Sequence, residues 1–142
     1  MNVLIRELTL ADYDQVMNLW TTCEGIGLSS ADTQQAVGSY LERNPHLSRV
    51  AEEAGRVAAA VLCGHDGRRG YLYHLAVRPV SRGRGIGRRL VQTCLVALQA
   101  DGIQKCHAFV FRDNLQGVDF WRHLGWTPRA DIGVVSIDMR SC

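Results

Sequence analysis

Apolar residues that recur every three to four positions predict two amphipathic helices in the first third of the chain, after a β-prone run at residues 3–8. The first stripe consists of Tyr13, Val16, Met17 and Trp20, and it ends near Cys23. The second stripe consists of Ala36, Val37, Tyr40 and Leu41, and Asn44-Pro45 ends it. A capping-box pattern precedes each helix, Thr9 to Asp12 in one case and Ser29 to Asp32 in the other.

The middle of the chain has the pattern of a β-sheet. Residues 47–52 and 56–64 read as two strands that are joined by a tight turn at 53–55. The run from Val57 to Cys63 is apolar without interruption, which is typical of a central strand that is covered on both faces. A further strand is predicted at residues 71–77.

Helical and strand patterns alternate over the rest of the chain. A helix is expected from about Gly85 to Ala100, then a strand at 103–112, then a helix that ends at Leu124. A final strand is predicted by the one-sided spacing of Val135, Ile137 and Met139. The element order βααβββαβαβ, without a linker or a repeat, predicts one mixed α/β (α+β) domain over residues 1–142.

Composition narrows the class of protein. The chain has 142 residues, 46% of them hydrophobic and 21% charged, with a net charge of +2, as is ordinary for one globular domain. Its five cysteines form no C-x-x-C pair and no zinc-binding spacing, so we expect reduced thiols and no metal. Without a signal-peptide pattern or an apolar run of membrane length, a cytoplasmic location is expected.

The stretch between the strand at 71–77 and the next helix is rich in glycine and arginine. Glycine allows successive backbone N–H groups to turn toward one ligand, and a helix N-terminus favours a negative charge. We therefore interpret this loop as a pyrophosphate cradle. The residues concerned are Arg82, Gly83, Arg84, Gly85, Ile86, Gly87 and Arg88, with Arg78 and Arg89 at the two ends.

Other interpretations of the loop are weaker. A Walker A loop requires a Gly-Lys pair, which the sequence lacks, and a dinucleotide fingerprint requires glycine where Arg88 stands. A nucleic-acid-binding surface is disfavoured because aromatic residues do not interleave with these arginines and the overall charge is nearly balanced. A solvated, glycine-rich turn stays open as an alternative.

Three motifs in the expected order resemble the GNAT superfamily of N-acetyltransferases. Arg82-x-x-Gly85-x-Gly87 resembles the family's acyl-CoA signature, and residues 75–79 resemble the strand end before it. Asn114 and the segment Phe120–Trp126 resemble its asparagine and its F-Y-x-x-x-G-[FY] segment. The resemblance implies a GNAT fold, with a mostly antiparallel sheet of six to seven strands and about four helices on both faces.

The resemblance also implies acetyl-CoA as the cosubstrate and places its contacts. The main chain of Leu75, Ala76 and Val77 would hold the pantetheine arm and polarise the thioester, as oxyanion donors do. The cradle would hold the pyrophosphate, and Asn114 and Trp121 would lie near the coenzyme arm. Helix capping is an equally good interpretation of Asn114.

The sequence departs from the family pattern at the acid–base positions. Trp121 stands where many members have a tyrosine acid, and the strand at 71–77 lacks the usual glutamate base. The best substitutes are His74, a residue type that titrates near neutral pH, and its neighbour Tyr73. Strict alternation would let only one of the two line the cleft. His107 and Glu24 are weaker candidates, and a water chain is as good an acceptor.

The expected activity is transfer of an acetyl group from acetyl-CoA to a primary amine of a small molecule or protein, by direct attack on the thioester. The alternative is a non-catalytic domain that senses acyl-CoA, since the family's tyrosine and glutamate are missing. No nucleic acid or membrane partner is expected, and a homodimer is a further expectation. The family's acceptor pocket implies wall residues at Trp20, Glu24, Ile26, Leu28 and Tyr73.

Overall fold

The computed structural model describes the backbone of residues 2–141 and the side chains of residues 2–140. The chain forms two compact units, Met1–Phe109 and Val110–Cys142. The first contains the whole β-sheet, and the second contains one α-helix. The assignment of residues 1–142 to a single functional domain stays a prediction.

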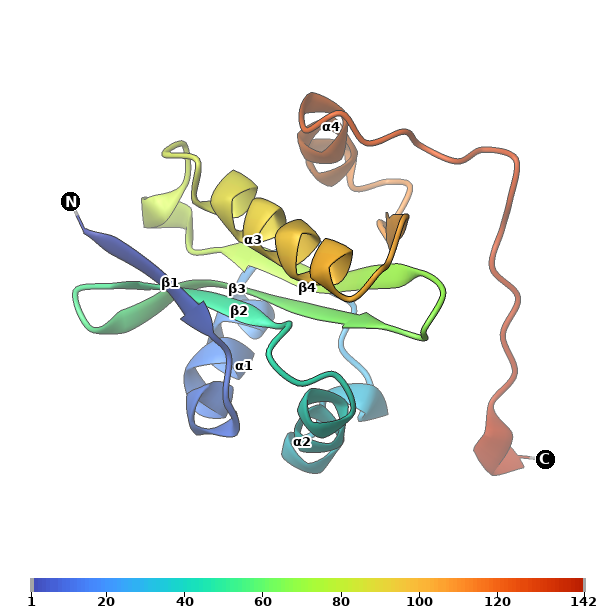
Figure 1. Ribbon diagram of the computed structural model, residues 1–142, viewed down its shortest axis with the longest axis horizontal. Helices are drawn as coiled ribbons and strands as arrows, with labels where there is room; N and C mark the ends of the chain where they lie inside the picture. The colour runs from blue at the N-terminus through green and yellow to red at the C-terminus, as the bar shows by residue number, and fades with distance from the viewer. Residues whose placement is uncertain (1, 142) are drawn as a thin grey trace. The chain divides into compact units, whose positions relative to one another are not determined.

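The first unit is built on a five-stranded sheet with the strand order β1-β2-β3-β4-β5 (Figure 1). Neighbouring strands run antiparallel except for β4 and β5, which are parallel. The strands are β1 (Val3–Glu7), β2 (Arg49–Glu53), β3 (Arg56–His65), β4 (Gly70–Val77) and β5 (Cys106–Ala108).

Helices cover both faces of this sheet. The helices α1 (Tyr13–Thr22) and α2 (Gln34–Arg43) lie on one face, and α3 (Ile86–Ala100) lies on the other (Figure 1). Short 3-10 turns, η1 (Leu10–Asp12) and η2 (Ser30–Asp32), precede α1 and α2, and η3 (Pro79–Ser81) follows β4. Both predicted capping boxes form, but they cap η1 and η2, and α2 begins after its own N-cap, Thr33.

The strand β3 is the centre of the core. Residues from Ala58 to Val61 are fully buried, as is Cys63, which confirms the prediction of a strand covered on both faces. Trp20 of α1 is 1% exposed and Leu90 of α3 is 0% exposed, so each helix contributes a buried anchor on its own side of the sheet.

The strand β4 departs from regular alternation. Its pairing with β3 shifts register between Ala60 and Leu62, which indicates a bulge in β4. His74 lies in the bulge and has a φ of 55°, a left-handed conformation that is uncommon outside glycine. Because the bulge adds a residue, Tyr73 and His74 both contact side chains from the face that carries α1 and α2. The expectation that only one of them reaches this face is therefore wrong.

The sheet has fewer strands than the predicted six to seven. Only Cys106–Ala108 of the predicted strand 103–112 is in the sheet, and the segment 133–138 forms no strand. Val135 is 98% exposed and Ile137 is 74% exposed. A strand needs a hydrogen-bonded neighbour, and none is present for this segment among the described residues. The second unit instead contains the helix α4 (Leu115–His123) and a terminal turn, η4 (Met139–Ser141).

Candidate active site

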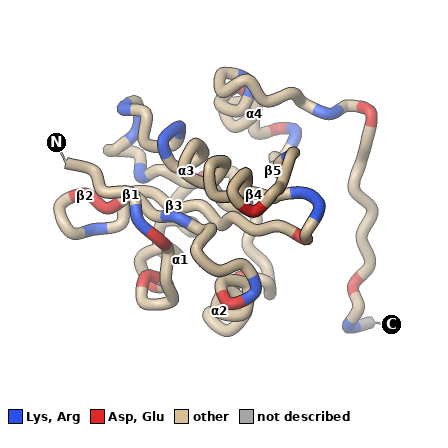
Figure 2. The backbone as a smooth tube through the Cα atoms, viewed as in Figure 1, with Lys and Arg blue, Asp and Glu red and all other residues tan. Residues whose placement is uncertain are grey.

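The predicted cradle lies between η3 and α3. Gly83 has a φ of 81° and Gly85 a φ of 78°, and a Cβ at either position would meet no atom within 4 Å. Gly85 is the N-cap of α3, and its carbonyl accepts the Arg89 N–H at 3.0 Å. Lys and Arg positions gather here (Figure 2). The loop thus combines open space, a helix N-terminus and positive charge, the properties of an anion site.

A buried carboxylate from β2 supports the loop. Glu53 is 8% exposed, and its Oε1 accepts hydrogen bonds from the Ser81 hydroxyl at 3.1 Å and from Arg84 Nη2 at 2.8 Å. Arg78 Nη2 lies 3.9 Å from the same oxygen. The hydrogen bond from Arg84, and after it the one from Ser81, holds the pKa of Glu53 below its ordinary value.

We expect Glu53→Gln to lower the melting temperature by a few degrees at pH 7. Because the pKa of Glu53 is depressed in the folded protein, its charge stabilises the fold above the ordinary glutamate pKa of about 4.3. This contribution is lost as the pH falls through the depressed pKa. Thermal melts over a series of pH values from 7 downward test the expectation, which fails if the difference between the proteins does not shrink as the pH falls. The control is Glu52→Gln on the same strand, which removes one of the two carboxylates paired with Arg6 and should have a smaller effect.

The Arg82 side chain contacts two groups of the protein itself. Its Nε donates to the Val77 carbonyl at 2.8 Å, and its Nη1 lies 3.2 Å from Glu24 Oε1. The guanidinium therefore ties the loop to the end of β4 and to the segment after α1. Arg88, in the first turn of α3, is exposed. A phosphate contact by either arginine stays a prediction.

The end of β4 has one open edge. The pairing with β5 stops at Leu72 and Ala108, while β4 continues to Val77. The Arg78 N–H donates to the Ala58 carbonyl of β3 at 2.8 Å. In an antiparallel pair every second residue bonds to the neighbouring strand, so the N–H and C=O of Val77 point away from β3. Ala76, by contrast, pairs with Ala60 of β3. Strand β4 thus offers a main-chain edge next to the loop.

His74 is held by two side chains from the helical face. Its Nε2 lies 2.9 Å from Asp32 Oδ1, and its carbonyl accepts the Trp20 indole N–H at 2.9 Å. The Trp20 ring also packs edge-on against the imidazole, with ring centroids 4.9 Å apart. The His74 side chain is 16% exposed, so part of it stays accessible.

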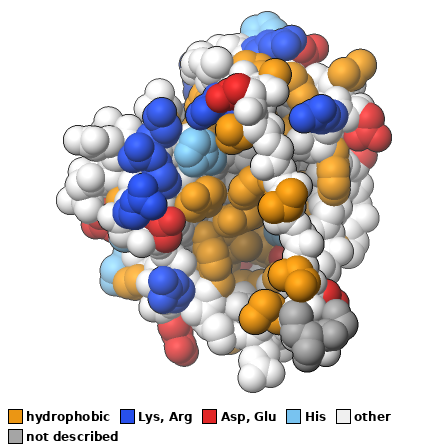
Figure 3. Space-filling view, turned by 90° about the vertical axis from the view of Figure 1, so that its right-hand side faces the viewer, with side chains coloured by type: hydrophobic (Ala, Val, Ile, Leu, Met, Phe, Trp, Pro, Cys, Tyr) orange, Lys and Arg blue, Asp and Glu red, His pale blue; other side chains and the backbone are white. Residues whose placement is uncertain are grey.

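Tyr73 belongs to a row of aromatic rings. It packs edge-on against Tyr40 at 6.3 Å and stacks with Tyr71 at 6.4 Å and with Phe109 at 5.9 Å between ring centroids. Burial raises the pKa of Tyr73, and Tyr71 raises it further, so its hydroxyl stays protonated near neutral pH. Phe109 is 58% exposed, and exposed hydrophobic side chains are visible in Figure 3.

The other residues predicted to line the acceptor pocket differ in solvent exposure. Trp20 is 1% exposed, so in this structure it lies beneath His74 and offers no surface to an acceptor. Glu24 is exposed and paired with Arg82. Ile26 packs against the core, and Leu28 is 37% exposed. Contact of any of these residues with an acceptor stays a prediction.

Asn114 and Trp121 lie in the second unit. The Asn114 side chain caps α4, because its Oδ1 accepts the Gly117 N–H at 3.0 Å. Trp121 packs against Phe120, with ring centroids 5.2 Å apart, and against Trp126 at 4.5 Å. Their roles near the coenzyme stay predictions.

Sequence reasoning did not assign Asp32 or Glu53 to the site. Asp32 carries a capping-box signal, and that signal concerns only its own helix start. Glu53 lies in a turn sequence that gives no sign of the loop it contacts. Both act over long sequence separations, 42 residues from Asp32 to His74 and 31 from Glu53 to Arg84.

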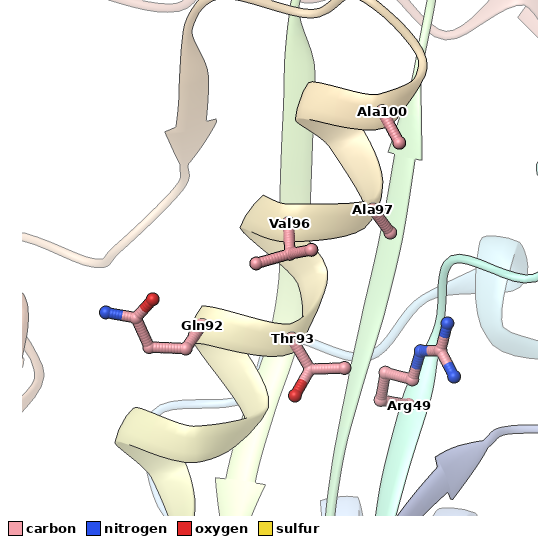
Figure 4. A pocket seen from close by; sticks show the side chains of 6 residues that line it. All are labelled: Arg49, Gln92, Thr93, Val96, Ala97 and Ala100. Atoms are coloured by element: carbon pink, nitrogen blue, oxygen red, sulfur yellow. The ribbon is translucent and has the colours of Figure 1, made fainter.

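A hollow of about 390 Å³ lies elsewhere, along α3 and next to Arg49 of β2 (Figure 4). It contains none of the predicted site residues, and it is lined by Arg49, Gln92, Thr93, Val96, Ala97 and Ala100. Within residues 2–141, His, Cys, Asp and Glu side chains form no group of three or more that could hold a metal ion. The helices described there are also too short or too polar to cross a membrane.

Comparison with known proteins identifies the family. The model of the acetyltransferase (GNAT) family matches residues 13–126, which include β4, the glycine loop and α3. The chain belongs to the GNAT acetyltransferase family. A related acetyltransferase from Pectobacterium atrosepticum is 36% identical over 110 residues, which are 78% of this chain and 77% of the relative.

Solved structures confirm the GNAT fold. Ard1 from Thermoplasma volcanium matches with a TM-score of 0.81 at 20% identity, over 92% of this chain and 86% of that one. The PaiA N-acetyltransferase from Thermoplasma acidophilum, in complex with coenzyme A, matches with a TM-score of 0.78 at 18% identity, over 94% of each chain. The predicted mixed α/β fold class is thus confirmed, with five strands in the described sheet.

Proposed function

We propose that this GNAT protein transfers an acetyl group from acetyl-CoA to a primary amine of a small molecule or protein. The observation that carries the proposal is the left-handed Gly85 at the start of α3, in the loop that follows the open edge of β4. A pyrophosphate bound at the helix N-terminus would let the pantetheine arm run along that edge. The thioester would then lie near Val77, on the strand that carries His74.

The proposed reaction is direct. The neutral amine attacks the thioester carbonyl carbon, the new C–N bond forms, and the C–S bond breaks. The electron pair of that bond leaves with the coenzyme A sulfur. A main-chain N–H at the open edge, such as that of Val77, would stabilise the oxyanion. His74 would accept the proton that the nitrogen loses.

A general acid is not required in this proposal. Thiols ionise near pH 8.5, so the thiolate is a fairly good leaving group. Trp121, at the family's tyrosine position, can donate a hydrogen bond but is not a useful acid. Tyr73 keeps its proton near neutral pH and can serve as a hydrogen-bond donor.

The state of two cysteines also favours direct attack over a cysteine-bound intermediate. Cys63 is fully buried, and its pKa is raised by a hydrogen bond with Cys94 and by burial. Burial raises the pKa of Cys106 to about 12. Neither thiol is thus disposed to form the reactive thiolate.

A panel of amines and peptides with acetyl-CoA tests the proposal, with free-thiol release and product mass as readouts. We expect one acceptor class to give both thiol release and a product heavier by one acetyl group. Tight acetyl-CoA binding without product on any acceptor would favour the alternative, a sensor of acyl-CoA. A cytoplasmic location and a homodimer stay predictions.

A further inference from the structure

The geometry points to Asp32 as the positioning residue for His74, a role that rests on the proposed function. Asp32 ends the turn η2 and is 5% exposed, and its carboxylate faces the imidazole across 2.9 Å. We assign to it two tasks: it fixes which imidazole nitrogen carries the proton, and it stabilises the imidazolium that forms during the reaction.

Both carboxylate oxygens of Asp32 have a defined partner. Oδ2 accepts the Ser29 backbone N–H at 2.9 Å, which closes the capping box. Oδ1 faces His74 Nε2. An ionised carboxylate can only accept hydrogen bonds, so Nε2 must carry the proton. In the neutral imidazole, Nδ1 then has the free lone pair and is the nitrogen that can act as a base.

The rest of the His74 residue is also fixed. The Trp20 indole holds its carbonyl at 2.9 Å, and the ring of Trp20 packs against the imidazole. The left-handed backbone in the bulge of β4 turns the side chain toward Asp32. A proton acceptor needs such an orientation, because a small displacement of a reacting group lowers the rate markedly.

The same capping motif occurs a second time, at Asp12, but there the carboxylate has a different partner. Asp12 ends η1, is 6% exposed, and its Oδ2 accepts the Thr9 backbone N–H at 3.0 Å. Both oxygens of Asp12 also accept from the Arg6 guanidinium, Oδ1 from Nη2 at 2.8 Å and Oδ2 from Nη1 at 2.9 Å. One oxygen therefore suffices to cap each turn. The carboxylate of Asp12 pairs with a permanent cation, whereas the second oxygen of Asp32 faces an imidazole.

The test is Asp32→Asn, with Asp12→Asn as the matched control. Asparagine can keep the cap through its carbonyl oxygen, and its NH₂ group would then donate to His74 Nε2. That exchange places the imidazole proton on Nδ1 and removes the base. We expect kcat to fall about 10²-fold, at the low end of the range for acid–base catalysis, while the KM for acetyl-CoA is unchanged.

The control distinguishes an effect of Asp32 on His74 from a general loss of protein stability. Asp12→Asn should lower the melting temperature, since it removes the negative charge that pairs with Arg6, and leave kcat unchanged. In a His74→Gln background, Asp32→Asn should cause no further loss of kcat, because Asp32 acts through the imidazole. A further loss in that background would show a merely structural role and overturn the inference.

Other outcomes are equally decisive. A kcat within twofold of wild type in Asp32→Asn overturns the role of Asp32 and leaves the acetyltransferase proposal intact. If the wild type turns over no acceptor, the proposed function fails, and NMR of the His74 ring nitrogens then decides the geometry. A neutral ring protonated at Nε2 supports the assignment, and one protonated at Nδ1 overturns it.

Discussion

Replacing His74 with glutamine is expected to lower kcat about 10²–10⁴-fold and to leave the affinity for acetyl-CoA unchanged. The glutamine amide can still donate to Asp32, but it cannot accept the proton that the attacking amine loses. Steady-state kinetics with the acceptor found in the panel would give kcat, and calorimetric titration would give the affinity.

The control for this variant is His65→Gln. His65 at the end of β3 also pairs with a carboxylate, and its Nε2 lies 3.1 Å from Asp101 Oδ2. Loss of this second histidine–aspartate pair should leave kcat within a few fold of wild type. Wild-type rates in His74→Gln would assign proton removal to water, and equal losses in both variants would indicate a general effect on folding.

Gly85→Val is expected to weaken acetyl-CoA binding on the order of 100-fold or more, because each hydrogen bond to a charged group contributes about 1.5–3 kcal/mol. A β-branched residue rarely adopts a φ of 78°, so the backbone at the start of α3 would have to turn. Its Cβ would also occupy the open space next to the loop. Calorimetric titration with acetyl-CoA measures the loss.

The matched control lies at the other end of the same helix. Gly102 has a φ of 84°, and a Cβ there also meets no atom within 4 Å. Gly102→Val should therefore cost similar stability without affecting the coenzyme. If both variants bind acetyl-CoA equally well, the pyrophosphate does not bind at Gly85. Gly85→Ala and Gly102→Ala give the same comparison with less strain, should the valine variants fail to fold.

The helices and central strands could be predicted because their signals are local. The stripe that includes Val16 and Trp20 is buried as predicted, and the apolar run of β3 forms the core strand. The glycine loop after β4 and the two other motifs led to the right family, because each motif consists of particular residue types at short, fixed spacings. Each of these features can be read within about fifteen residues.

The arrangement of side chains around His74 could not be predicted. Alternation assigns neighbouring residues of a strand to opposite faces, and a bulge breaks that rule without a clear signal in the sequence. The partner of His74 is Asp32, and the sequence around Asp32 predicted only a helix cap. Arg82 likewise contacts Val77 and Glu24, and the charge of its loop gave no hint of these partners.

The C-terminal strand was predicted wrongly for a related reason. Val135, Ile137 and Met139 have the one-sided spacing of a strand, but spacing cannot show whether a neighbour is available for hydrogen bonding. Strand formation depends on residues far away in the chain, whereas a helix such as α4 satisfies its own backbone groups. The same dependence on a neighbouring strand explains why β5 is shorter than the strand predicted at residues 103–112.

The buried contact of Glu53 with the glycine loop has a consequence for local unfolding of this protein. Glu53 ends β2 at the hairpin that leads into β3, and the same carboxylate holds Ser81 and Arg84. Breaking the hairpin would remove these contacts from the loop, so we expect both segments to open as one cooperative unit. In the absence of coenzyme, their backbone amides should exchange with solvent at matched rates. A bound pyrophosphate would then slow exchange in a hairpin that it never touches.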